Sequence, residues 1–205
     1  MMDYNFAESL KKYTHRDYDD LYGLRCEMFY GYICPMDSPR DFSPSLWHQR
    51  TVGAIYYQLR QFLNTDTNKQ GEVILSPFDV RLFDMYPDVK NDFDDRNNNI
   101  VQPDLLFVHD KAKVARGVCC DGAPDFVVEV VSGFSKIIDV ISKKDIYLKY
   151  GVKEYWVVGR DRVLTYLLNE GSYTETGYDL DFNDMREIPV AELPGCFIHL
   201  KNTVD

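Results

Sequence analysis

The hydrophobic pattern of the chain consists of short apolar runs and one long amphipathic segment. The stretch RCEMFYGYI, residues 25–33, is rich in aromatic and other strand-favouring residues and predicts a strand or hairpin with Gly31 at a turn. Residues 46–63, LWHQRTVGAIYYQLRQFL, carry apolar side chains at helical spacing. We expect a helix there, capped by Ser43 or Ser45.

Strand-like and helix-like segments alternate through the rest of the chain. Apolar runs predict strands on both sides of Pro77 and in the ranges 101–108, 125–131, 154–159 and 162–168. Helices are expected at about 16–21 and from Ser132 or Ser135 to Gly151, with a short helix or loop at 111–124. The run DFVVEVV is apolar at almost every position, so this strand should be buried on both faces. The pattern predicts an α/β (α+β mixed sheet) fold, with a central mixed β-sheet flanked by helices.

The composition is that of a globular protein with one substantial core. The chain has 205 residues, of which 45% are hydrophobic and 27% charged. Acidic residues outnumber basic ones by 33 to 23, giving a net charge of −10 that repels a polyanion at long range. This disfavours non-specific coating of nucleic acid and is compatible with a local basic cleft.

The cysteines indicate a reducing compartment. There are five, an odd number, and none of their spacings matches a zinc site. The first residues lack the apolar core of a signal peptide, and no apolar run reaches the length of a membrane span. We therefore expect a cytoplasmic protein without a membrane partner.

Two carboxylates stand within or beside predicted strands. Glu129 interrupts the buried run DFVVEVV, and Asp104 follows Pro103 at the start of another apolar run. Burying an ionised carboxylate is unfavourable unless a cation compensates its charge. If the two strands are neighbours, the carboxylates could form a site for a hard cation such as magnesium. Glu129 could equally form a structural ion pair with Lys143 or Lys144, and the residues alone leave both interpretations open.

Six motifs in a fixed order carry a resemblance to a known family. They are R-C-E (25–27), H-Q-R (48–50), V-Q-P-D (101–104), A-P-D-F-V-V-E-V (123–130), K-x-x-x-Y (143–147) and G-V-K-E-Y-W-V-V (151–158). Together they resemble the Uma-type endonucleases, a bacterial family of the PD-(D/E)XK nuclease superfamily once described as a domain of unknown function. The likeness extends from about Tyr13 to about Leu200. It implies a single restriction-endonuclease-like domain over residues 1–205, with its core at about 13–200.

The resemblance implies an enzyme that hydrolyses the phosphodiester bonds of DNA with a metal-activated water. Asp104 and Glu129 match the two acids that would bind magnesium or manganese, with the main-chain carbonyl of Val130 as a further candidate ligand. Glu27 matches the upstream acid of the family, an additional metal or water ligand. The K-x-x-x-Y pattern assigns the catalytic lysine to Lys143, with Lys144 as the alternative.

Two positions depart from the pattern of the superfamily. Val131 stands two residues after Glu129, where the lysine usually lies, and Gly133 replaces a proline common in the family. With the acidic net charge, the missing lysine leaves open an alternative function, a catalytically inactive binding or assembly module with the nuclease fold. The expected partners are DNA as the substrate and, as an open option, a second copy of the chain.

Other polar and aromatic residues are interpreted first as structural. His48 on the amphipathic helix is expected to be partly buried and hydrogen-bonded, with a substrate contact as the alternative. Asp125 should cap or pair locally, although a position near Glu129 would also let it reach the site. The remaining residues interpreted as caps or packing groups are Gln102, Ser132, Ser135, Tyr155 and Trp156.

Overall fold

The computed structural model describes residues 11–21, 25–36, 44–65, 70–82, 99–131, 143–180 and 187–200. Its helices are α1 (His15–Asp19), α2 (Leu46–Asn64), the short 3-10 helix η3 (Lys111–Val114) and a helical segment at 143–149. The strands are β1 (Cys26–Phe29), β2 (Tyr32–Pro35), β3 (Glu72–Leu75), β4 (Asp79–Leu82), β5 (Asn99–Val101), β6 (Leu105–Val108), β7 (Cys119–Asp121), β8 (Phe126–Val130), β9 (Glu154–Val158), β10 (Arg162–Asn169), β11 (Ser172–Asp179), β12 (Ile188–Pro189) and β13 (Phe197–Ile198). Among the helices in these ranges, none has both the length and the apolar character needed to cross a bilayer.

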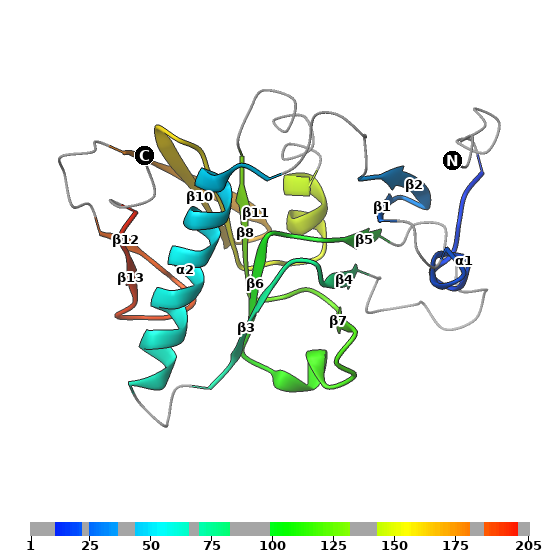
Figure 1. Cartoon of the computed structure of the whole chain (residues 1–205), viewed down its shortest axis with the longest axis horizontal. Helices are drawn as coiled ribbons and strands as arrows, with labels where there is room; N and C mark the ends of the chain where they lie inside the picture. The colour runs from blue at the N-terminus through cyan, green and yellow to red at the C-terminus, as the bar shows by residue number, and fades with distance from the viewer. Residues whose placement is uncertain are drawn as a thin grey trace.

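Most of the strands form two large mixed sheets (Figure 1). The six-stranded sheet has the order β11-β10-β9-β8-β6-β3, and the five-stranded sheet has the order β2-β1-β5-β4-β7. Each contains one parallel pair, β8 with β9 and β4 with β7, beside antiparallel neighbours. Strands β12 and β13 pair antiparallel in a separate two-stranded sheet. The mixed α+β fold class is therefore confirmed, with the strands divided among several sheets rather than gathered in one.

Helix α2 covers one face of the six-stranded sheet, as Figure 1 shows. It begins after Ser45, whose hydroxyl accepts a hydrogen bond from the His48 backbone N–H at 3.2 Å. Most of the apolar side chains predicted for one face are buried and pack in the core with β6, β8 and β9, namely Val52, Ile55, Leu59 and Leu63. Phe62 is partly buried against the same core, whereas Leu46, predicted on this face, is 65% exposed. This helix was expected at 46–63 and extends to Asn64.

The opposite face of the six-stranded sheet packs against the five-stranded sheet and the helical segment 143–149. Strand β8 is buried at every position, as expected, and its side chains alternate between the two faces. Phe126, Val128 and Val130 face α2, whereas Val127 belongs to the core on the other side. The alternation therefore directs Glu129 away from α2, toward the helical segment.

The run expected as one strand at 101–108 is divided between the two sheets. Its first residue, Val101, ends β5, which pairs with β1 and β4, and its last four form β6, which pairs with β3 and β8. Pro103 lies between them and has no N–H to continue a ladder. Residues 76–78 likewise connect β3 of the six-stranded sheet to β4 of the five-stranded sheet. We call these two connections, residues 76–78 and residues 102–104, the crossings between the sheets.

Two further strands were not expected from the sequence. The segment Cys119–Asp121, within the range expected as a short helix or loop, forms β7. The polar segment Ser172–Asp179, for which no element was predicted, forms β11 by pairing with β10 along its length. Most of β11 is exposed, so no apolar alternation marks it. The proposed caps Ser132 and Ser135 lie outside the described residues, as does Gly133.

Candidate active site

The candidate site lies where the chain passes between the two sheets. The crossing 76–78 contacts the crossing 102–104, since the Ser76 N–H donates to the Asp104 carbonyl at 3.1 Å. Strand β1, which pairs with β5, supplies Glu27 beside this junction. Strand β8, which pairs with β6, supplies Glu129. Residues far apart in the sequence are therefore brought together by strand pairing.

Four buried side chains form what we call the carboxylate–lysine cluster: Glu27, Glu129, Lys143 and Tyr147. The Lys143 Nζ atom lies 2.8 Å from Glu27 Oε1 and 3.1 Å from Glu129 Oε1. The Tyr147 hydroxyl donates to the same oxygen of Glu129 at 3.1 Å. Lys143 and Tyr147 are four residues apart on the helical segment, so both project from one face. None of the four is more than 7% exposed.

The Tyr147 phenol of this cluster stays protonated. Burial raises the pKa of Tyr147 well above its usual value, and the neighbouring Glu129 raises it further. The phenol therefore acts as a hydrogen-bond donor to Glu129. Lys143 contacts both carboxylates, so one ammonium faces two carboxylate groups in a buried site.

Asp104 is held on the α2 side of the junction. Its Oδ2 atom accepts a hydrogen bond from the Val130 N–H at 2.7 Å, and its Oδ1 atom lies 3.3 Å from Nε2 of His48. The other ring nitrogen of His48 lies 3.0 Å from the Val130 carbonyl. Both ring nitrogens thus face oxygen acceptors, and a ring protonated on both can donate to both. His48 is buried and hydrogen-bonded as expected, and it also fixes the position of Asp104.

Gln102 forms hydrogen bonds with two carboxylates near the junction, Glu27 and Asp79. Its backbone N–H donates to Glu27 Oε1 at 2.7 Å, and its side-chain Nε2 donates to Asp79 Oδ1 at 2.7 Å. Burial raises the pKa of Asp79, although the hydrogen bond from Gln102 acts in the opposite direction. Gln102, interpreted from the sequence as structural, lines the same pocket as Asp104, because residues two apart on an extended chain project to the same side.

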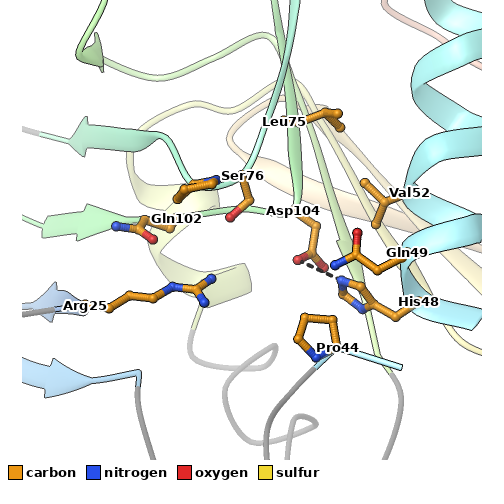
Figure 2. A pocket seen from close by; sticks show the side chains of 10 residues that line it. Arg25, Pro44, His48, Gln49, Val52, Leu75, Ser76, Gln102 and Asp104 are labelled. Carbon is orange, nitrogen blue, oxygen red and sulfur yellow. Dashed lines mark ion pairs between the residues drawn. The ribbon is translucent and has the colours of Figure 1, made fainter. Parts of the chain in front are cut away.

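A pocket of about 680 Å³ opens beside Asp104 (Figure 2). Asp104 and His48 lie in its wall with Gln49 of α2, and Arg25 reaches toward them from the chain just before β1. The remaining lining residues are Pro44, Val52, Leu75, Ser76, Pro77 and Gln102. This volume is within the range typical of small-molecule sites, about 300–1,000 Å³.

The other candidate residues lie apart from these contacts. Lys144, the alternative lysine, has its Nζ atom 4.6 Å from the centre of the Tyr166 ring rather than against Glu129. Asp125 pairs with Lys153 at 2.7 Å and accepts the His109 N–H, so its role is local. Tyr155 and Trp156 are fully buried in the two cores, as expected.

Sequence reasoning missed the roles of three polar residues. Tyr147 stood in the quoted K-x-x-x-Y motif, which was a usable signal for its contact with Glu129. Gln102 and Asp79 gave no comparable signal, because their contact depends on how the two crossings meet.

The carboxylates fit a hard divalent cation by their chemistry. Asp104, Glu129 and Glu27 offer the oxygen donors that magnesium and manganese prefer. Within the described ranges, no three His, Cys, Asp or Glu side chains are gathered closely enough to hold a metal ion. The ammonium of Lys143 lies against Glu27 and Glu129, His48 contacts Asp104, and the Val130 carbonyl, a candidate ligand, contacts His48. A bound divalent cation would take over some of these contacts.

Comparisons with known proteins agree with this architecture. A crystal structure of "a putative nuclease belonging to DUF820" from Anabaena variabilis is similar over 87% of this chain and 88% of that one, with a TM-score of 0.58. At 14% sequence identity, this likeness shows the fold alone. A search of curated proteins finds no match. The family model Uma2, described as "Putative restriction endonuclease", matches residues 15–199. Since this match covers nearly the whole chain, the protein belongs to the Uma2 family.

Proposed function

We propose that the protein is a metal-dependent endonuclease that hydrolyses phosphodiester bonds of DNA. The observation that carries the proposal is the contact of buried Lys143 with both Glu27 and Glu129, next to the junction that holds Asp104. A buried ion pair is an inefficient source of stability, because apolar replacements are often neutral or stabilising. Clusters of buried ionisable groups are instead common at catalytic sites. Membership in a restriction-endonuclease family supports the same chemistry.

In this proposal the carboxylates bind the metal ion and the attacking water. Asp104 and Glu129 are the proposed ligands of magnesium or manganese, with Glu27 as an additional ligand of metal or water. When bound, such an ion polarises a phosphoryl oxygen and lowers the pKa of a bound water. Lys143 offsets negative charge near the scissile phosphate, and His48 keeps Asp104 in position through the 3.3 Å contact.

Cleavage of DNA by isosteric variants tests the proposal. Wild-type protein should cleave plasmid, short duplex or single-stranded DNA when magnesium or manganese is added. Asp104→Asn and Glu129→Gln should each lower the rate by about 10²–10³-fold, the usual effect of removing one electrostatic group from an active site. Asp161→Asn, a matched change at an exposed position, should leave the rate unchanged. Equal rates in all four proteins would reject the site, and no cleavage by wild type would reject the activity.

A second candidate function is a non-catalytic binding or assembly module that retains the nuclease fold. It is favoured by the net charge of −10 and by the contacts that Lys143 makes with Glu129 and that His48 makes with Asp104. Calorimetric titration with manganese separates the two candidates. Binding that is lost in Glu129→Gln supports the enzyme, whereas the absence of binding at millimolar metal supports the module.

A further inference from the structure

The pocket beside Asp104 contains polar groups that the protein itself leaves available. No described residue pairs with the guanidinium of Arg25, and none hydrogen-bonds to the side-chain amide of Gln49. Both residues are exposed and line the pocket, and in Figure 2 the Arg25 side chain extends toward the helix that carries Gln49. An arginine in this position offers a planar set of donors that suits a phosphate.

The pocket also has an apolar wall. Val52 projects from α2, and Leu75 at the end of β3 is 38% exposed, which is high for a large aliphatic side chain beside a core. Figure 2 shows these two side chains on the same side of the pocket, away from Arg25. A ligand that fits must therefore combine an anionic group with an apolar or flat body. A nucleotide unit has this combination of a phosphate with a base.

Other parts of the pocket lining are fixed by hydrogen bonds. Gln102 is tied to Glu27 through its backbone N–H and to Asp79 through its side chain, and the Ser76 N–H is tied to the Asp104 carbonyl. Such a preformed wall needs no rearrangement before a ligand enters, which lowers the free-energy cost of binding.

We propose that this pocket binds one unpaired nucleotide of the substrate strand, with a backbone phosphate on Arg25 and the base against Val52 and Leu75. The inference rests on the proposed nuclease function and adds the substrate class, a single strand or a frayed strand end. In a duplex the faces of each base are stacked on its neighbours, so a base can reach an apolar wall of this kind only after it leaves the stack. Arg25 also places positive charge opposite Asp104 in a protein that is strongly acidic overall.

Binding of labelled oligonucleotides in EDTA tests the inference without cleavage. Wild-type protein should bind a short fluorescein-labelled single-stranded DNA more tightly than the same sequence as a blunt duplex, measured by fluorescence anisotropy. Arg25→Gln should weaken single-strand binding by about 10- to 100-fold, the effect of losing a charged hydrogen bond. Arg25→Lys should retain part of the affinity, because it keeps the charge and loses the planar geometry. Arg116→Gln removes one exposed positive charge outside the pocket and should bind as wild type.

The outcomes separate this inference from the proposed function. Unchanged binding in Arg25→Gln, or equal affinity for single strand and duplex, overturns the nucleotide pocket whether or not the protein cleaves DNA. Single-strand binding that depends on Arg25, in a protein that cleaves nothing with added metal, keeps the pocket and removes the nuclease. Loss of cleavage in Arg25→Gln with unchanged binding also overturns the pocket, because it places Arg25 in the chemistry rather than in binding.

Discussion

Lys143→Met is the substitution that tests the carboxylate–lysine cluster most directly. Methionine fills much of the space of the lysine stem but leaves Glu27 and Glu129 buried without the ammonium that contacts both. Removing one partner of a buried ion pair destabilises a protein by about 3–5 kcal/mol, since the remaining charge is uncompensated. The total free energy of unfolding of a domain is about 5–15 kcal/mol, so a large fraction should be lost.

Urea denaturation and thermal melting measure this loss. For a chain of 205 residues, 1 kcal/mol corresponds to about 2–4 °C in Tm, so we expect a fall of roughly 6–20 °C. Lys144→Met is the matched control at the next position. Its Nζ atom lies 4.6 Å from the centre of the Tyr166 ring, a contact worth about 0.5–1 kcal/mol.

A triple variant shows whether the cause is charge. Glu27→Gln and Glu129→Gln added to Lys143→Met remove both uncompensated carboxylates while keeping the side-chain shapes. Most of the lost stability should return. The reasoning is refuted if Lys143→Met is as stable as Lys144→Met, or if the triple variant is less stable than Lys143→Met alone.

Three further predictions concern other parts of the structure. His48→Phe should lower stability by about 1–3 kcal/mol in urea denaturation, because it removes the contacts of His48 with the Val130 carbonyl and with Asp104; wild-type stability would contradict the described contacts. Burial alone would raise the pKa of Asp125, but hydrogen bonds from Lys153 and a backbone N–H hold it below its ordinary value. This contribution is present near neutral pH and is lost as the pH falls through the lowered pKa, so Lys153→Met should destabilise the protein at neutral pH and approach wild type in acid. Gly71→Ala should lower Tm, because Gly71 has φ +143° and an added Cβ would collide with the Phe107 ring; an unchanged Tm would contradict this geometry.

The sequence predicted the parts of the fold that depend on local pattern. The apolar spacing of α2 and the continuous apolar run of β8 both correspond to elements that bury those residues. Strand β11 has mostly exposed polar residues and exists through its pairing with β10, so no local pattern could reveal it. The division of 101–108 between two sheets was also hidden, because Pro103 can begin a strand as readily as it can end one.

The candidate site was predictable as a set of residues but not as an arrangement. Motif order placed Glu27, Glu129 and Lys143 in one list, and the structure brings these three into contact. The same list contained Asp104, which the structure holds through His48 and the backbone of β8. The sequence could not predict that Asp104 and the carboxylate–lysine cluster have different contacts, since this depends on which face of β8 each side chain approaches.

Because the lysine is not on the strand, packing at the strand position and the charge beside Glu129 depend on different residues. In the short superfamily motif, one strand residue both packs in the sheet and carries the ammonium. Here Val131 donates its N–H to Val158 and packs against the core, while Lys143 brings the ammonium from a different element. Substitutions at the strand position can therefore change packing without changing the charge near Glu129. A substitution of Lys143 changes both the charge beside Glu129 and the stability of the buried cluster.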